Sequence, residues 1–259
     1  MKVRLLKTML AATLLLSGIA FGSSSDVAMH EYEAALNLTP NLENGKKVFK
    51  ICAVCHAPEG WGLDNGAYPQ VAGQHKTVII KQLADIRARN RDNPTMRPFT
   101  SPSLLGGAQD LADVAAYIAQ LPMTPENGKG PGNDLELGGK LYEDNCTECH
   151  GKNGEGDTED HIPAIYGQHY RYLVRQFEWI KTGRRRNADS KMVKQIRGFR
   201  HRDVMAVMDY VSRLQPSAEK VAEKGWMNPD FPNYARKPAM GAGYMIDQRA
   251  TRPPRPATR

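Results

Sequence analysis

Two short stretches with the same pattern decide how this chain folds: Cys-Ala-Val-Cys-His at residues 52–56 and Cys-Thr-Glu-Cys-His at residues 146–150. Together they hold all 4 cysteines of the 259-residue chain. In a secreted protein two disulfides are the first interpretation, but a histidine follows each pair at once. A zinc site of four cysteines has its pairs about 15–20 residues apart, whereas 90 residues lie between Cys55 and Cys146. A thioredoxin-like redox pair needs one motif and no following histidine.

Cys-x-x-Cys-His is the attachment pattern of haem c. The two thiols of a motif add to the two vinyl groups of one haem, and the adjacent histidine is then held beneath the iron as its proximal ligand. The sequence therefore predicts two covalently bound haem c groups. The predicted thioether residues are Cys52 and Cys55 for haem 1 and Cys146 and Cys149 for haem 2, and the predicted iron ligands are His56 and His150.

The first 22 residues have the pattern of a secretory signal peptide. Three basic residues precede an apolar run over residues 8–21, and Ala20 and Gly22 put small residues at the −3 and −1 positions of a cut before Ser23. The run is too short for a membrane span of about 20 residues, and an uncleaved N-terminal anchor is the alternative. In either case we expect the folded part outside the cytoplasm, in a bacterial periplasm.

The net charge of +7 first suggests a nucleic-acid partner, but its distribution argues against one. Residues 1–22 carry +3 and residues 217–259 carry +4, whereas residues 23–216 hold 24 basic and 24 acidic residues. The body therefore has no overall basic field to attract nucleic acid. With 41% hydrophobic and 24% charged residues, the composition excludes a polytopic membrane protein and a wholly disordered chain.

The chain is internally duplicated. The two motifs lie 94 residues apart, and the same offset relates Gly45 to Gly139, Pro69 to Pro163, Gly73-Gln74-His75 to Gly167-Gln168-His169, and Gln82 to Gln176. We expect one domain at 42–123 and a second at 132–216, joined by a linker over 124–131 and preceded by an N-terminal segment over 23–41. A basic, Pro-rich tail follows over 217–259.

Both halves have the same predicted helical plan, and no alternating strand pattern appears. A short helix leads into each motif, a Gly-rich loop follows, and a second helix is expected at 76–89 and at 170–181. Apolar residues at helical spacing predict closing helices near 109–121 and 201–214. Each half has about 80 residues, which is small for a self-sufficient core, so a buried haem would supply the missing apolar mass. The fold class is therefore all-α.

Methionine is the expected sixth ligand of each iron, because a soft thioether stabilises the ferrous form and raises the potential. Met96 and Met192 lie in polar loops, 40 and 42 residues after the proximal histidines. His75 and His169 are the rival ligands, since they are repeated too. If these two histidines do not bind iron, we expect them at the start of a helix or on the surface. Met205 and Met208, on the second closing helix, are expected to fill the core.

Two repeated prolines have a predicted role beside the proximal histidines. Pro69 and Pro163 each lie 13 residues beyond the histidine of their motif. A backbone carbonyl there could accept the ring N–H of His56 or His150. Such a bond would fix the orientation of the imidazole and tune its basicity.

These residues resemble the tandem di-haem class I cytochromes c, most closely the cytochrome c4 type. The paired motifs carry the resemblance, with Pro-x-x-x-Gly-Gln-His in each half, the loop methionines, and Asp-Leu-Ala-Asp-Val-Ala-Ala-Tyr at 110–117. It covers about residues 42–216. It implies two all-α domains related by a pseudo-twofold, haem propionates that face each other across the interface, and His/Met ligation.

The resemblance also implies an electron carrier that is not an enzyme. Its partners would be redox proteins, such as a membrane quinol–cytochrome c reductase as donor and a terminal oxidase or reductase as acceptor. Two alternatives stay open. A di-haem oxidoreductase, such as a thiosulfate dehydrogenase or a peroxidase, would need an open or replaceable axial position. A fixed subunit of a larger respiratory complex could dock through the 217–259 tail.

The chain departs from the family pattern in three places. Ala57-Pro58 replaces the Gly that follows the second motif as Gly151. The segment from Met96 to Asp110 is 14 residues long, against 11 in the second half. The tail lies outside the pattern, and its aromatic part is expected to pack over a haem or to bind a partner. A weaker possibility is that Met240 or Met245, in the same tail, caps an iron.

Charge in the second half is strongly divided along the sequence. Residues 143–160 carry seven acidic residues against one lysine, and residues 171–202 carry eleven basic residues against two acidic ones. The simplest interpretation is that these charged residues lie on a surface exposed to solvent. The functional hypothesis is that Arg184, Arg185 and Arg186 surround the exposed edge of haem 2 and steer an acidic partner.

Overall fold

The structure, a computed structural model, describes residues 23–234. The predicted leader and residues 235–259, with Met240 and Met245, lie outside the described residues. The elements are α1 (Ser24–Leu36), α2 (Leu42–His56), α3 (Lys76–Arg87), the 3-10 helix η1 (Arg97–Thr100), α4 (Pro102–Leu105), α5 (Ala108–Gln120), α6 (Leu135–Asn145), α7 (Thr147–His150), α8 (Tyr170–Lys181), α9 (Ser190–Ile196), α10 (His201–Val211) and the 3-10 helix η2 (Ala218–Lys220). Between residues 23 and 234 only two isolated β-bridges occur, and no strand. The all-α prediction is confirmed.

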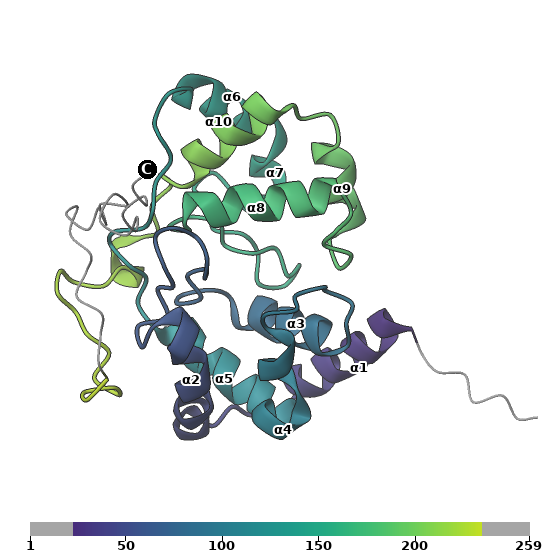
Figure 1. The fold of residues 1–259 in the computed structure, drawn as a ribbon, viewed down its shortest axis with the longest axis vertical. Helices are drawn as coiled ribbons and strands as arrows, with labels where there is room; N and C mark the ends of the chain where they lie inside the picture. The colour runs from purple at the N-terminus through teal and green to yellow at the C-terminus, as the bar shows by residue number, and fades with distance from the viewer. Residues whose placement is uncertain (1–22, 235–259) are drawn as a thin grey trace, which may run out of the picture.

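The helices form two halves, with α1 to α5 in one and α6 to α10 in the other (Figure 1). In each half the helix before the motif crosses the closing helix, α2 on α5 and α6 on α10. None of the helices in the described part of the chain is long and apolar enough to cross a membrane.

A glycine lets each pair of helices approach closely. A Cβ atom on Gly45 would lie 2.2 Å from the carbonyl oxygen of Asp113, and one on Gly138 would lie 2.2 Å from that of Ala206. The structural counterpart of Gly45 is therefore Gly138, and the match of Gly45 with Gly139 by offset was wrong. The offset of 94 residues does not hold at this position, because α2 runs unbroken to the motif histidine, whereas α6 ends before Cys146 and α7 begins after it.

The closing helices bury the residues that their periodicity marks. In α5 the side chains of Leu111, Val114 and Ile118 are buried, and in α10 so are Val204 and Val207. Met208 is buried in the same cluster, and Met205 is partly buried against it. The prediction that both methionines fill the core is confirmed.

Residues 24–36, which the sequence left as an undefined segment, form α1. The Ser23 side chain accepts a hydrogen bond from the backbone N–H of Asp26 and so caps the helix. Tyr32 and Ala35 are buried in the first core cluster. The Tyr32 hydroxyl also lies 3.0 Å from the ring of His161, so α1 contacts the second half.

The described part of the tail returns to the first half instead of leaving the molecule (Figure 1). The Met123 N–H donates to the Lys220 carbonyl at 2.7 Å, and the Ala222 N–H donates to the Met123 carbonyl at 2.9 Å. Beyond this bridge Phe231 is buried in the first core cluster. The aromatic residues of the tail that the structure describes therefore pack on the chain's own first domain.

Candidate functional site

One pocket gathers the predicted ligands of haem 1 from distant parts of the chain. Cys52, Cys55 and His56 line it from the last two turns of α2, and Met96 lines it from the residue that precedes η1. The other lining residues are apolar: Ile51, Leu83, Phe99, Leu105 and Val114. Two of them, Phe99 and Leu105, come from the segment between Met96 and Asp110, which is three residues longer than its counterpart in the second half. The longer segment therefore forms part of this pocket.

The histidines of the two motifs are oriented by the predicted hydrogen bonds. The Nδ1 atom of His56 lies 2.9 Å from the Pro69 carbonyl oxygen, and that of His150 lies 3.2 Å from the Pro163 carbonyl oxygen. This confirms the hydrogen bonds predicted for the two prolines. Burial lowers the pKa of both imidazoles. Each ring is therefore neutral, with Nδ1–H donated to the carbonyl and Nε2 left to bind a metal.

The second motif lies in a more open setting. Cys146 is half-buried at the residue that precedes the short helix α7, and Cys149 is exposed within that helix. Met192 lies in the first turn of α9 instead of the predicted loop, because the Asp189 side chain caps that helix and accepts the Met192 N–H at 3.2 Å. Met192 packs against the core cluster that Cys146 also contacts.

The residues present fit haem c. All four cysteines, which lie within the described residues, are free. Burial raises the pKa of Cys52 and of Cys146 to about 12, as expected for sulfur atoms that face an apolar space. In the first pocket two thiols, an imidazole and a thioether sulfur meet among aliphatic and aromatic side chains. This donor set and this apolar lining suit an iron porphyrin attached through two thioether bonds.

The rival histidines lie at the interface between the halves. The Nε2 atom of His75 is 2.7 Å from the Glu155 carbonyl oxygen, and that of His169 is 2.7 Å from the Trp61 carbonyl oxygen. The second ring nitrogen of each is also engaged, with the Thr158 hydroxyl and the Gly128 N–H. Both residues do start a helix, as predicted. The surface interpretation is wrong for His169, which is 1% exposed.

The glutamines of the repeated Gly-Gln-His also join the halves, and they do so in the same way twice. Gln168 accepts from the Gln70 N–H at 3.0 Å and donates to the Gln70 carbonyl at 2.9 Å. Gln74 makes the same two bonds with Ala164, at 3.0 and 2.9 Å. The predicted pseudo-twofold is visible in these paired contacts. The sequence showed the repeat of the glutamines, but it did not reveal their role.

Two arginines lie at the same interface, Arg91 buried and Arg185 half-buried. Arg91 donates to the side-chain oxygens of Gln82 and Gln176 at 2.8 and 3.0 Å. Arg185 donates to the same two oxygens at 2.9 and 3.1 Å. Burial, with the charge of Arg91 next in size, lowers the pKa of Arg185 to about 9. The structure thus holds two guanidinium groups side by side between the halves, where an anionic group would relieve their repulsion.

The hypothesis of three arginines around a haem edge needs correction. Arg185 faces the interface, and Arg186 donates to the Arg89 carbonyl at 2.6 Å. Arg184 is exposed and lies over the Trp179 ring at 4.4 Å. The sequence could not separate these neighbours, because their partners lie in other segments.

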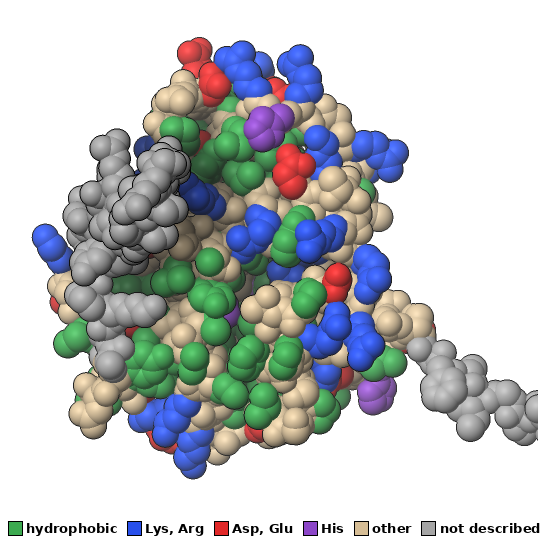
Figure 2. All heavy atoms as spheres, in the orientation of Figure 1, with side chains coloured by type: hydrophobic (Ala, Val, Ile, Leu, Met, Phe, Trp, Pro, Cys, Tyr) green, Lys and Arg blue, Asp and Glu red, His purple; other side chains and the backbone are tan. Residues whose placement is uncertain are grey.

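A basic surface nevertheless remains on the second half. Lys and Arg side chains gather where α9 and the loop before it lie (Figure 2). The exposed bases of residues 181–202, which we call the basic surface, are Arg184, Arg186, Lys191, Lys194, Arg197, Arg200 and Arg202. Asp189, within the same run, is engaged as the cap of α9.

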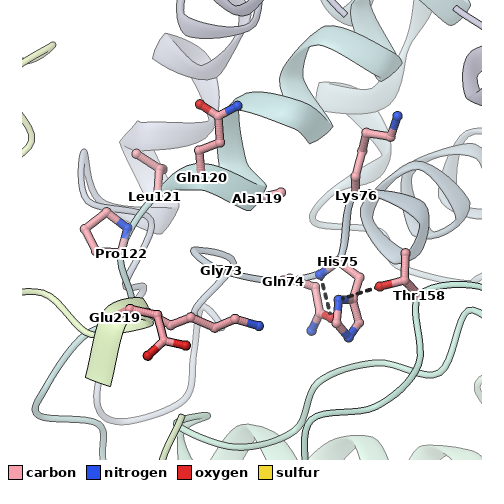
Figure 3. Close-up of a pocket in the computed structure, with 11 residues that line it drawn as sticks. Gly73, Gln74, His75, Lys76, Ala119, Gln120, Leu121, Pro122, Thr158 and Glu219 are labelled. Atoms are coloured by element: carbon pink, nitrogen blue, oxygen red, sulfur yellow. Dashed lines mark hydrogen bonds between the residues drawn. The ribbon is translucent and has the colours of Figure 1, made fainter. Parts of the chain in front are cut away.

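A cleft of about 270 Å³ lies where the two halves and the tail meet (Figure 3). His75 and Lys76 line it from the first half, Thr158 from the second, and Glu219 and Lys220 from the tail. Its lining contains no cysteine or methionine. The cleft is thus a polar part of the interface between the halves and is separate from the haem 1 pocket.

Comparisons with known proteins agree with this geometry. The family model for cytochrome c matches residues 42–122 and 135–215. Cytochrome c4 of Azotobacter vinelandii is 31% identical over 182 residues, which is 63% of this chain and 84% of that protein. The thiosulfate dehydrogenase electron acceptor of Stutzerimonas stutzeri is 29% identical over 199 residues, 69% of this chain and 90% of that protein. The crystal structure of reduced recombinant cytochrome c4 from Pseudomonas stutzeri superposes with a TM-score of 0.61 at 26% identity, covering 68% of this chain and 100% of that one.

Proposed function

Because the chain belongs to the cytochrome c family, we propose that it is a periplasmic electron carrier. It carries two covalently bound haem c groups in tandem domains of the cytochrome c4 type. Both proposed His/Met sites are closed, which means that a histidine and a methionine occupy the two axial positions of each iron. The observation that carries the proposal is the pocket in which Cys52, Cys55, His56 and Met96 meet. The repeat extends the assignment to Cys146, Cys149, His150 and Met192.

When bound, a haem c iron alternates between the ferric and ferrous states and so holds one electron. The protein sets the potential and controls access. The Pro69 carbonyl orients the His56 ring at 2.9 Å. The soft Met96 sulfur favours the ferrous iron and raises the potential. The apolar lining of the pocket excludes water. The chain itself makes and breaks no substrate bond.

The interface supports transfer between the two haems. Haem c carries two propionates, and in the cytochrome c4 arrangement that the sequence resembles these face each other between the domains. The guanidinium groups of the buried Arg91 and the half-buried Arg185 lie between the halves and carry positive charge. They would compensate propionate charge there. The paired glutamine and histidine bonds hold the two halves in one arrangement, so the spacing between the haems would stay constant.

The optical spectrum tests the closed sites. We expect the purified ferric protein to show the far-red charge-transfer band of methionine–iron ligation, and the ferrous protein not to bind carbon monoxide readily. The measurement is a pair of spectra, ferric and ferrous, with and without cyanide or carbon monoxide. A high-spin haem, or one that binds carbon monoxide at once, would contradict the carrier proposal. It would favour an enzyme of the thiosulfate dehydrogenase or peroxidase type.

The proposed partners are redox proteins with an acidic docking face, such as a terminal oxidase or reductase on one side and a quinol–cytochrome c reductase on the other. The basic surface supports this choice through charge complementarity. The name of one relative, a thiosulfate dehydrogenase electron acceptor, offers a further class of donor. The leader pattern supports the periplasmic location. Residues 217–234 of the tail pack on the first domain. They therefore do not support the alternative in which the tail docks on a larger complex.

Neutralising part of the basic surface should slow reaction with anionic redox partners. In Arg184→Gln/Lys194→Gln/Arg197→Gln protein we expect the oxidation rate by ferricyanide at low salt to fall about tenfold, with a flatter dependence on ionic strength. Stopped-flow absorbance of the ferrous protein measures it. The control removes three exposed lysines elsewhere in the second half, Lys129, Lys140 and Lys152. Equal rates in the two variants would rule out local steering by the basic surface.

A further inference from the structure

The turn that follows the proximal histidine is strained in the first half alone. Ala57 ends α2 with φ 65° and ψ 158°, a region that is essentially restricted to glycine. In the second half Gly151 holds the equivalent place with φ 75° and ψ 171°. A strained residue persists only where its surroundings hold it. The first half therefore has to hold a strained residue at this turn, whereas the second half has a glycine there.

The two halves anchor this turn differently. In the second half the Tyr142 hydroxyl donates to the Gly151 carbonyl at 2.6 Å, so the anchor comes from α6 of the same domain. Phe49 holds the corresponding place in α2, and its ring packs at a tilt against Tyr117 as that of Tyr142 packs against Tyr210. Phenylalanine has no hydroxyl, so α2 cannot supply the bond.

The tail supplies bonds at this turn. We call residues 223–234 the strap. Asn228, which is 2% exposed, donates from Nδ2 to the Pro58 carbonyl at 2.7 Å. Its backbone N–H donates to the Glu59 carboxylate at 3.2 Å. One strap residue therefore bonds to both positions that follow Ala57.

Further contacts fasten the strap on both sides of Asn228. Trp226 packs on Trp61 with ring centroids 5.8 Å apart. Phe231 packs edge-on against Phe49 at 6.0 Å, covering the ring that lacks the hydroxyl. The Tyr234 hydroxyl donates to the carbonyl of Ala53, within the Cys-x-x-Cys-His motif, at 3.2 Å. An ion pair of Asp230 with Lys46 at 2.6 Å adds a link to α2.

A chain of backbone bonds connects this turn to the iron ligand. The Gly62 N–H donates to the His56 carbonyl at 2.8 Å, and the Gly60 carbonyl accepts from the Val71 N–H at 2.7 Å. The segment that contains Val71 also provides the Pro69 carbonyl, which orients the His56 ring. Movement at residues 57–59 would therefore reach the proximal histidine through its hydrogen-bond acceptor.

We propose that the strap is a clamp that holds the strained Ala57–Glu59 turn, and that Asn228 is a positioning residue for the proximal histidine of haem 1 and not of haem 2. The inference rests on the proposed His56/Met96 site. It goes beyond the family pattern, because the matched regions end at residue 215. A loosened strap would let the His56 ring tilt, and this would weaken the hold of the proposed His56/Met96 site on its iron.

Cyanide binding to the ferric di-haem protein tests the clamp, because cyanide binds only when methionine leaves the iron. In Asn228→Ala protein we expect one of the two haems to bind cyanide at least tenfold faster, while the other keeps the wild-type rate. Met227→Ala is the matched control, since its side chain is 61% exposed on the same strap. Adding Met192→Ala opens haem 2 in advance, so that the remaining slow phase reports on haem 1.

A second substitution tests the role of strain. Ala57→Gly removes the conformational penalty, so in the Asn228→Ala background it should restore the slow rate at haem 1. Equal acceleration at both haems, unchanged rates, or no rescue by Ala57→Gly would each overturn the clamp. Where Asn228→Ala does not yield di-haem protein, Tyr234→Phe removes the bond from the strap to the Ala53 carbonyl and should accelerate the same haem to a smaller degree. A wild-type protein that already binds cyanide at once would refute the proposed function instead.

Discussion

Replacing Met96 by alanine should open the iron of haem 1 and remove half of the far-red ferric band. Met96 lines the same pocket as Cys52, Cys55 and His56, and the other lining side chains are aliphatic or aromatic. They can offer no substitute for the thioether. Loss of a ligand that favours ferrous iron should lower the potential of this haem by an amount on the order of 0.1 V, within the roughly 0.8 V that axial ligands span.

Spectroelectrochemical titration of the two haems measures this change, with carbon monoxide binding as a second readout. Met192→Ala should remove the other half of the band, and the double variant should lose all of it. Met205→Ala is the control, because Met205 is partly buried in the second half with its sulfur 3.5 Å from the Tyr170 hydroxyl. A Met96→Ala protein that keeps the full band would show that another residue binds the iron.

Gly138→Ala should destabilise the second domain by about 3 kcal/mol, a large part of a total stability of about 5–15 kcal/mol. The new methyl group would lie 2.2 Å from the Ala206 carbonyl oxygen and 2.8 Å from its carbon. These are backbone atoms of α10, so relief requires α6 and α10 to separate. The gain in helix propensity, about 1 kcal/mol, is too small to compensate.

Guanidinium unfolding followed by the far-red band measures this loss of stability. Gly139→Ala is the matched control, because its methyl group would meet the edge of the Tyr210 ring at 3.1 Å, and a ring can shift. We expect that change to stay within about 1 kcal/mol. If Gly139→Ala were the more damaging substitution, the pairing of Gly45 with Gly138 across the repeat would be incorrect.

The haem sites could be predicted from the sequence because their chemistry is local. Two thiols and a histidine within five residues define an attachment site whatever surrounds them. The proline that orients the histidine follows at a constant 13 residues in both halves, and the structure shows both carbonyl bonds. Comparing the halves also singled out Met96, which the fold then brings into the pocket with His56.

Prediction failed where a side chain's role depends on a remote partner. His169 looked like a surface residue, yet its ring bonds to the Trp61 carbonyl, 108 positions away. Arg185 looked like one of three exposed charges, yet Gln82, 103 positions away, draws it into the interface. Histidine and arginine also occur on surfaces exposed to solvent, so the residue type alone does not reveal a buried partner. No local periodicity distinguishes the interface positions from surface positions.

The amino-acid sequence was thus sufficient for the cofactor, the number of domains, the helical class and the likeness of the two halves, since all of these follow from short motifs and their repetition. The tertiary structure decided how the halves join, which charges are buried, and where the tail goes. Asn228 illustrates the reason. Its partners Pro58 and Tyr117 lie 170 and 111 positions away. A contact over such a separation exists only once the whole chain has folded.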